Sequence, residues 1–163
     1  MVTLRAFTQS DTDLLIDYLN NPSLVRFLSP KIPFPYTETD ANWWINQGNK
    51  TGITRAIDVD GVFVGCIGAL PGEFEYCKSA ELGYWLAQDY WGQGIICIAI
   101  SLLIDELKMT TDIVRLHAVV FAGNQQSSKV LTKTGFSYEG TRVKAIYKNA
   151  EFYDALLYGK LLG

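Results

Sequence analysis

The sequence feature that most constrains the fold of this chain is a pair of glycines, Gly92 and Gly94, between two apolar segments. Residues 79–87 before the pair are typical of a β-strand, and residues 95–107 after it have the length and apolar content of a buried helix. A strand, a glycine turn and a helix start leave unpaired backbone N–H groups at the positive end of a helix dipole. Such a cluster suits phosphate or pyrophosphate, so the sequence favours a nucleotide-bearing cofactor.

The remaining segments predict a single mixed α/β sheet with helices on both faces. An Asp60-Gly61 turn between two β-rich runs predicts a hairpin, and Thr37 to Asp40 resembles a capping box at the start of a helix. Three prolines predict a loop over residues 23–36, with one helical turn near residues 24–27. We expect strands at residues 2–7, 53–59, 62–70, 79–87, 114–121, 136–143 and 152–161, and helices at about residues 11–20, 37–47, 95–107 and 125–134.

Length and charge narrow the functional classes. A chain of 163 residues predicts one domain spanning residues 1–163, and its net charge of −3 argues against nucleic-acid or membrane-surface binding. No apolar run is long enough to cross a bilayer, and the N-terminus lacks the pattern of a signal peptide. Three cysteines (Cys66, Cys77 and Cys97) without metal-ligand spacing, and a single histidine, predict reduced thiols, no metal and a cytoplasmic location. The sequence leaves monomer and homodimer open.

Two segments together resemble the GNAT superfamily of N-acetyltransferases. Residues 80–95, Ala-Glu-Leu-Gly-Tyr-Trp-Leu-Ala-Gln-Asp-Tyr-Trp-Gly-Gln-Gly-Ile, resemble its acyl-CoA motif, and residues 121–136 resemble its second motif. The stretches at residues 139–141, 152–154 and 158–159 resemble the branch of ribosomal-protein N-terminal (Rim-type) acetyltransferases. The resemblance covers nearly the whole chain. It implies a GNAT fold with a mostly antiparallel sheet of about seven strands, and acetyl-CoA as co-substrate.

The same resemblance implies where the co-substrate lies. In the family, the strand before the glycine turn splays from its neighbour, and its backbone pairs with the pantetheine arm. The positions that match this pantetheine-binding strand end are Tyr84, Trp85 and Leu86, and the positions that match the pyrophosphate-binding turn are Gln93, Gly94, Ile95 and Ile96. The family has Gly or Ala at the last of these positions. The bulkier Ile96 either crowds the pyrophosphate or points into the core.

Amide formation from a thioester requires three events. A proton must leave the attacking ammonium, the carbonyl must be polarised as an oxyanion develops, and a thiolate must leave. The resemblance makes Glu81, on the strand that leads to the cofactor, the candidate base, although a solvated carboxylate on an alternating strand explains it equally well.

Ser127 is the candidate group that meets the leaving thiolate. Many family members use a tyrosine at the position of Leu131, whereas the Rim-type branch carries Asn-x-x-Ser, which Asn124 and Ser127 match. Asn124 is expected both to cap a helix and to bind the pantetheine or the substrate; capping alone would explain it, and a plain polar residue in the first helical turn would explain Ser127.

Three other polar or aromatic residues have plainer explanations. His117 lies within an expected strand and is more typical of a core or sheet-face residue than of a catalyst. Trp43 and Trp44 are adjacent, so one at most faces the core fully and the other is a candidate for the acceptor pocket wall.

The sequence therefore predicts an acetyl-CoA-dependent N-acetyltransferase that transfers an acetyl group to a primary amine by direct attack. The Rim-type resemblance favours a protein N-terminal α-amine as acceptor. One alternative is an enzyme of the same chemistry acting on a small amine such as an antibiotic, a polyamine or an amino acid. An alternative of another class is a non-catalytic acyl-CoA-binding regulatory module, suggested by Ile96 and by the absent tyrosine.

Overall fold

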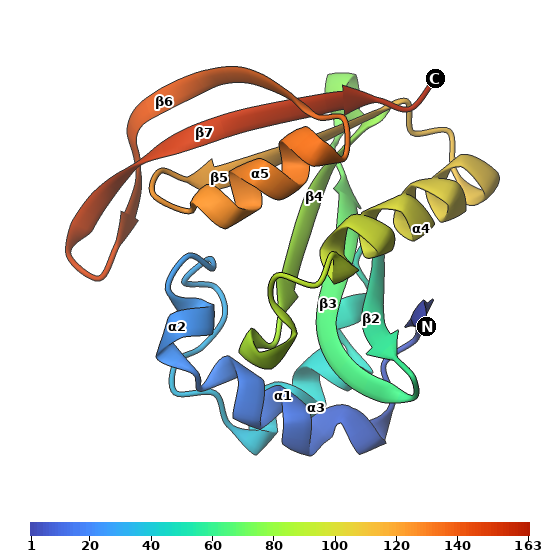
Figure 1. Ribbon diagram of the computed structural model, residues 1–163, viewed down its shortest axis with the longest axis vertical. Coiled ribbons are helices and arrows are strands. Elements are labelled where there is room, and N and C mark those ends of the chain that lie inside the picture. The colour runs from blue at the N-terminus through green and yellow to red at the C-terminus, as the bar shows by residue number, and fades with distance from the viewer.

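The computed structural model, which describes residues 1–163, is built on one seven-stranded sheet (Figure 1). Its strand order is β1-β2-β3-β4-β5-β7-β6, and every neighbouring pair is antiparallel except the parallel pair β4 and β5. The strands are β1 (Val2–Arg5), β2 (Ile53–Val59), β3 (Val62–Pro71), β4 (Ser79–Leu86), β5 (Arg115–Phe121), β6 (Ser137–Lys148) and β7 (Glu151–Leu161). The mixed, mostly antiparallel sheet expected from the sequence is confirmed.

Five α-helices cover the two faces of this sheet. They are α1 (Thr12–Leu19), α2 (Pro22–Val25), α3 (Glu38–Asn46), α4 (Ile95–Thr110) and α5 (Gln125–Lys133). One core cluster joins α4 and α5 to one face, and a second, smaller cluster joins α1, α2 and α3 to the other. Helices on both faces are therefore confirmed, and no helix is long and apolar enough to cross a membrane.

Local sequence signals set several of these elements. Asp60 and Gly61 both have positive φ angles (52° and 88°), which the tight turn between β2 and β3 requires. The side chain of Thr37 accepts a hydrogen bond from the backbone N–H of Asp40, and the Asp40 carboxylate accepts one from the backbone N–H of Thr37. This reciprocal capping box begins α3 as the sequence predicts.

Two elements run further than expected. Helix α4 continues to Thr110 rather than ending near residue 107, and β6 extends to Lys148 rather than ending near residue 143. The extension of β6 passes through an irregularity between Arg142 and Ile146, where Lys144 has a φ of 53°. This bulge breaks the strand pattern in the sequence, yet pairing with β7 resumes beyond it.

Candidate active site

The candidate site lies where β4 and β5 separate. Their parallel pairing comprises only three residue pairs and ends at Glu81 and His117. Beyond that point β4 continues to Leu86 and β5 to Phe121 without pairing to each other, and the space between them belongs to a cavity of about 1360 Å³. The edge of β4 over residues 82–86 therefore faces a cavity, which is the splay that the pantetheine-binding role of residues 84–86 requires.

The glycine turn at the end of β4 has the geometry of an anion site. Gly92 and Gly94 have φ angles of 74° and 76°, in the left-handed region where residues with a Cβ are strained. Gly94 is the N-cap of α4, and no side chain caps this 16-residue helix. Its first backbone N–H groups are thus left without a side-chain partner at the positive end of the dipole.

The residues assigned to the pyrophosphate turn differ in exposure. Gln93 and Gly94 are exposed, whereas the side chains of Ile95 and Ile96 belong to the core cluster and are only 5% and 8% exposed. Of the two alternatives for Ile96, the structure therefore favours the one in which its side chain points into the core. The indole N–H of Trp91 donates to the carbonyl of Leu86 (2.7 Å), which fixes the turn against the end of β4.

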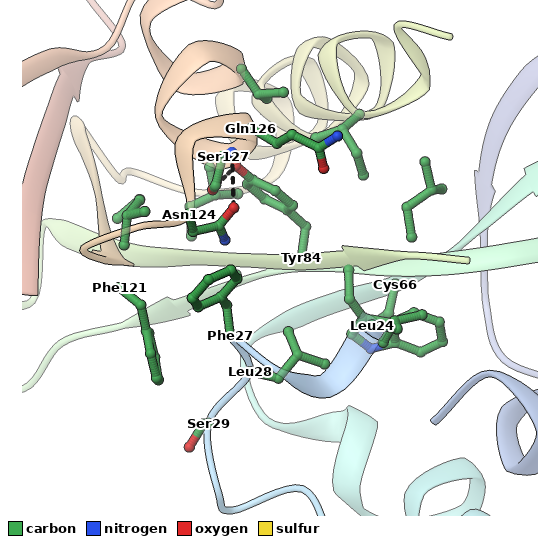
Figure 2. Close-up of a pocket in the computed structure, with 18 of the residues that line it drawn as sticks. Leu24, Phe27, Leu28, Ser29, Cys66, Tyr84, Phe121, Asn124, Gln126 and Ser127 are labelled. Carbon is green, nitrogen blue, oxygen red and sulfur yellow. Dashed lines mark hydrogen bonds between the residues drawn. The ribbon is translucent and has the colours of Figure 1, made fainter. Parts of the chain in front are cut away.

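The period-two alternation of β4 divides the cavity into two halves. Tyr84 points to the same face as the core residues Leu82 and Leu86, beneath α4 and α5. Glu81 and Trp85 point to the opposite face, where Trp85 packs against the second core cluster. Figure 2 shows this division: Tyr84, Asn124 and Ser127 lie on one side of the strand, and Leu24, Phe27 and Leu28 lie on the other.

A hydroxyl pair occupies the half beneath α5. The oxygens of Tyr84 and Ser127 lie 2.6 Å apart (Figure 2). Burial raises the pKa of Tyr84 to about 12, and its hydrogen bond with Ser127 opposes part of that rise. Asn124 is the N-cap of α5, and its side-chain oxygen accepts a hydrogen bond from the backbone N–H of Ser127 (3.3 Å). Leu131, at the family's tyrosine position, is fully buried and offers no polar group.

The hydrogen bond between the Tyr84 side chain and Ser127 was not predicted from the sequence, which assigned only the backbone of Tyr84 to the site. Two signals were available. The alternation Leu82, Tyr84, Leu86 places Tyr84 on the apolar face of β4. A tyrosine buried on such a face usually needs a hydrogen-bond partner.

The other half of the cavity contains Glu81, whose side chain is 54% exposed. Its carboxylate lies 4.0 Å from His117 Nε2, and His117 Nδ1 lies 3.3 Å from the hydroxyl of Ser79. His117 is thus a half-exposed residue on the sheet face, as expected, and its ring is next to the candidate base. Trp44 lines the cavity and packs edge-on against Phe7, whereas Trp43 is 56% exposed.

Comparison with known proteins shows which family this chain belongs to. Residues 1–137 match the model of the acetyltransferase (GNAT) domain. The chain belongs to the GNAT acetyltransferase family. This GNAT protein is therefore an N-acetyltransferase, and its co-substrate is acetyl-CoA. No group of three or more His, Cys, Asp or Glu side chains is placed to hold a metal ion.

Individual relatives and structural neighbours are also named as acetyltransferases. The GNAT chain is 28% identical over 167 residues to YdaF of Bacillus subtilis (strain 168), whose name provisionally describes a ribosomal N-acetyltransferase; the match covers 98% of this chain and 91% of YdaF. The structure of RimL, a ribosomal L7/L12 α-N-protein acetyltransferase bound to coenzyme A, has a TM-score of 0.85 at 21% identity, covering 98% of this chain and 93% of RimL. Spermidine N-acetyltransferase from Vibrio cholerae, in complex with CoA and spermine, has a TM-score of 0.81 at 19% identity, covering 99% and 95%. At these identities the two structural likenesses establish the fold.

Proposed function

We propose that this GNAT protein acetylates a protein N-terminal α-amine by direct attack, with Glu81 as the base and Ser127 as the group that meets the leaving thiolate. The observation that carries the proposal is the division of the cavity by β4. An exposed carboxylate lies on one face and a half-buried hydroxyl pair on the other, with the gap between β4 and β5 connecting them.

The residues divide the chemistry as follows. Acetyl-CoA supplies the acetyl group as a thioester. Glu81 takes one proton of the ammonium, directly or through water, so that the neutral nitrogen forms the C–N bond as the C–S bond breaks. The nitrogen then loses its second proton, which passes to the departing thiolate and gives the free thiol. The Ser127 hydroxyl donates a hydrogen bond to the sulfur, which leaves with the bonding electrons. The Tyr84 hydroxyl donates to Ser127 Oγ and so holds the serine in place.

The co-substrate is proposed to bind along β4 and at the start of α4. Residues 84–86 present their backbone to the gap for the pantetheine, Asn124 flanks it, and residues 93–96 present N–H groups to the pyrophosphate. Lys129 and Lys133 on α5 also line the cavity and add positive charge for the phosphates.

The assignment of the acetyl-CoA-binding residues is tested by measuring thermal unfolding in the presence of acetyl-CoA, CoA or ATP. A ligand that binds only the folded state at 100 times its dissociation constant adds about 2.7 kcal/mol. We expect several degrees of stabilisation by acetyl-CoA and CoA and none by ATP. The absence of any shift with millimolar acetyl-CoA would refute the assigned binding residues.

The catalytic roles are tested by thiol release from acetyl-CoA with peptide acceptors. Glu81→Gln and Ser127→Ala should each lower kcat at least tenfold, because a positioned proton-transfer group contributes about 10²–10⁴ in rate. Matched controls are Glu75→Gln, an exposed carboxylate outside the cavity, and Ser128→Ala, the next residue along α5. Wild-type rates in both active-site variants would show that other groups move the protons.

The cellular setting is also part of the proposal. Cys66, Cys77 and Cys97 are all free, which supports a reducing, cytoplasmic location. We propose that residues 1–163 act as one domain, as a monomer or homodimer, without nucleic acid or membrane as partner. Sedimentation of the purified chain distinguishes the two oligomeric states.

A further inference from the structure

The half of the cavity that contains Glu81 has two glycines in its floor, and the side chain of Thr54 lies beside one of them, Gly68. Gly68 on β3 pairs with Gly83 on β4, and both point to the same face as Glu81 and Trp85. A Cβ placed on Gly83 would meet no atom within 4 Å, and Gly83 does not have a left-handed φ. Neither backbone conformation nor close packing therefore requires glycine at this position, and its effect is to leave open volume beside the candidate base.

The walls around this floor are apolar. Leu24 and Tyr36 are buried, while Phe27 and Leu28 are half-buried on the segment that follows α2 and line the cavity. Figure 2 shows Leu24, Phe27 and Leu28 together on this side of β4. Trp85 closes one end of the floor and packs edge-on against the second core cluster. A group lying over Gly83 would thus contact aromatic and aliphatic surface.

One carboxylate and two cations line the half of the cavity that contains Glu81. Glu81 is the only Asp or Glu among the residues that line the cavity. Arg26 and Lys31, on the segment after α2, are exposed cations that line it from the same side as the apolar wall. A second ammonium on the acceptor would meet like charge rather than a carboxylate, which disfavours polycations.

We infer that the acceptor is a monoamine with a large apolar group next to the amine, such as a peptide that begins with Phe or Leu, and that a polyamine is a poor acceptor. The inference rests on the proposed function and specifies its substrate class. The apolar group lies over Gly83 against the wall after α2, and the amine lies at Glu81. Even one methylene in such a pocket changes specificity about 10–200-fold.

The experiment compares kcat/KM by thiol release from acetyl-CoA for peptides that differ only in their first residue, Phe, Leu or Gly, and for spermidine. We expect Phe-first and Leu-first peptides to exceed the Gly-first peptide and spermidine at least tenfold. A preference for spermidine or for the Gly-first peptide overturns the inference. No thiol release with any acceptor refutes the proposed function, and the inference with it, whereas turnover without size preference refutes the inference alone.

A variant tests the place of the apolar group. Gly83→Val fills the open floor, and we expect it to lower kcat/KM for the Phe-first peptide at least tenfold. The value for the Gly-first peptide should stay within threefold, and the KM of acetyl-CoA within twofold. Val143→Ile, on the exposed part of β6, controls for an added methyl on a strand and should change neither. An equal loss for both peptides would overturn the assignment of Gly83 as a size filter.

Discussion

The hydroxyl pair of Tyr84 and Ser127 gives the sharpest quantitative prediction. Their oxygens lie 2.6 Å apart in the half of the cavity beneath α5. Because burial raises the pKa of Tyr84 to about 12, its hydroxyl stays protonated across the range in which the enzyme is assayed. Tyr84→Phe keeps the ring and removes only the partner that orients Ser127.

The magnitude follows from the value of one neutral hydrogen bond. Such a bond contributes about 0.5–1.5 kcal/mol, which corresponds to roughly a twofold to twelvefold change in rate. We therefore expect Tyr84→Phe to lower kcat by that factor, which is less than the loss in Ser127→Ala. The KM of the acceptor should not change, since Tyr84 points away from the face that contains Glu81.

A double-mutant cycle measures the coupling. In the absence of the Ser127 hydroxyl, the Tyr84 hydroxyl has nothing to orient, so the double variant should be no slower than Ser127→Ala alone. Tyr138→Phe is the control, because Tyr138 also contacts a hydroxyl, that of Thr141, but lies on the exposed part of β6. Steady-state kcat from thiol release provides all the rates. Strict additivity of the two substitutions would refute the orienting role of Tyr84.

Three further predictions concern stability and the apolar wall on the segment after α2. Asp11 is 2% exposed and is paired with Arg5 (2.8 Å). Burial alone would raise its pKa, but the hydrogen bonds and the charge of Arg5 outweigh burial and lower it. Its stabilising contribution is therefore full above the unfolded-state pKa of about 4 and is lost as the pH falls through the lowered pKa of the folded state. Asp11→Asn should lower the free energy of unfolding by about 2 kcal/mol at pH 7, and less in acid, as measured by urea denaturation at both pH values. Gly94→Ala should cost about 1 kcal/mol by the same measurement, since it forces a left-handed residue at the start of α4. Lys148 donates to the backbone carbonyls of Val25 and Leu28 (2.6 Å each) and so holds the segment that forms the apolar wall. Lys148→Met should therefore raise the KM of the acceptor severalfold and leave the KM of acetyl-CoA unchanged, as measured by two-substrate kinetics.

Local signals explain why much of the fold was predictable. The Asp60-Gly61 turn and the capping box at Thr37 each act within four residues, and each begins or joins an element where the sequence places it. The resumption of β6 after its bulge was not predictable in this way. It depends on pairing with β7, in which Tyr147 is opposite Phe152, and such pairing is a tertiary effect.

The candidate site was predictable to different degrees in its two halves. The glycine turn that is proposed to bind the pyrophosphate could be predicted as a turn, because it is formed by the backbone of consecutive residues, with Gly92 and Gly94 at fixed spacing. The half of the cavity that contains Glu81 is assembled from distant segments. Lys148 lies 120 residues from Leu28 in sequence, yet its ammonium donates a hydrogen bond to the carbonyl of Leu28. No local sequence pattern indicates this contact.

The alternation of β4 has a consequence for how specificity can change in this fold. Glu81 and Gly83 share one face of the strand, while Tyr84 lies on the other with its partner on α5. Residues in the half of the cavity that contains Glu81 can therefore be substituted without touching the hydroxyl pair or the helix start that is proposed to bind the pyrophosphate. Because the two faces meet only at the gap between β4 and β5, substitutions at Gly83 and Tyr84 should combine additively in kcat/KM, in contrast to the pair Tyr84 and Ser127.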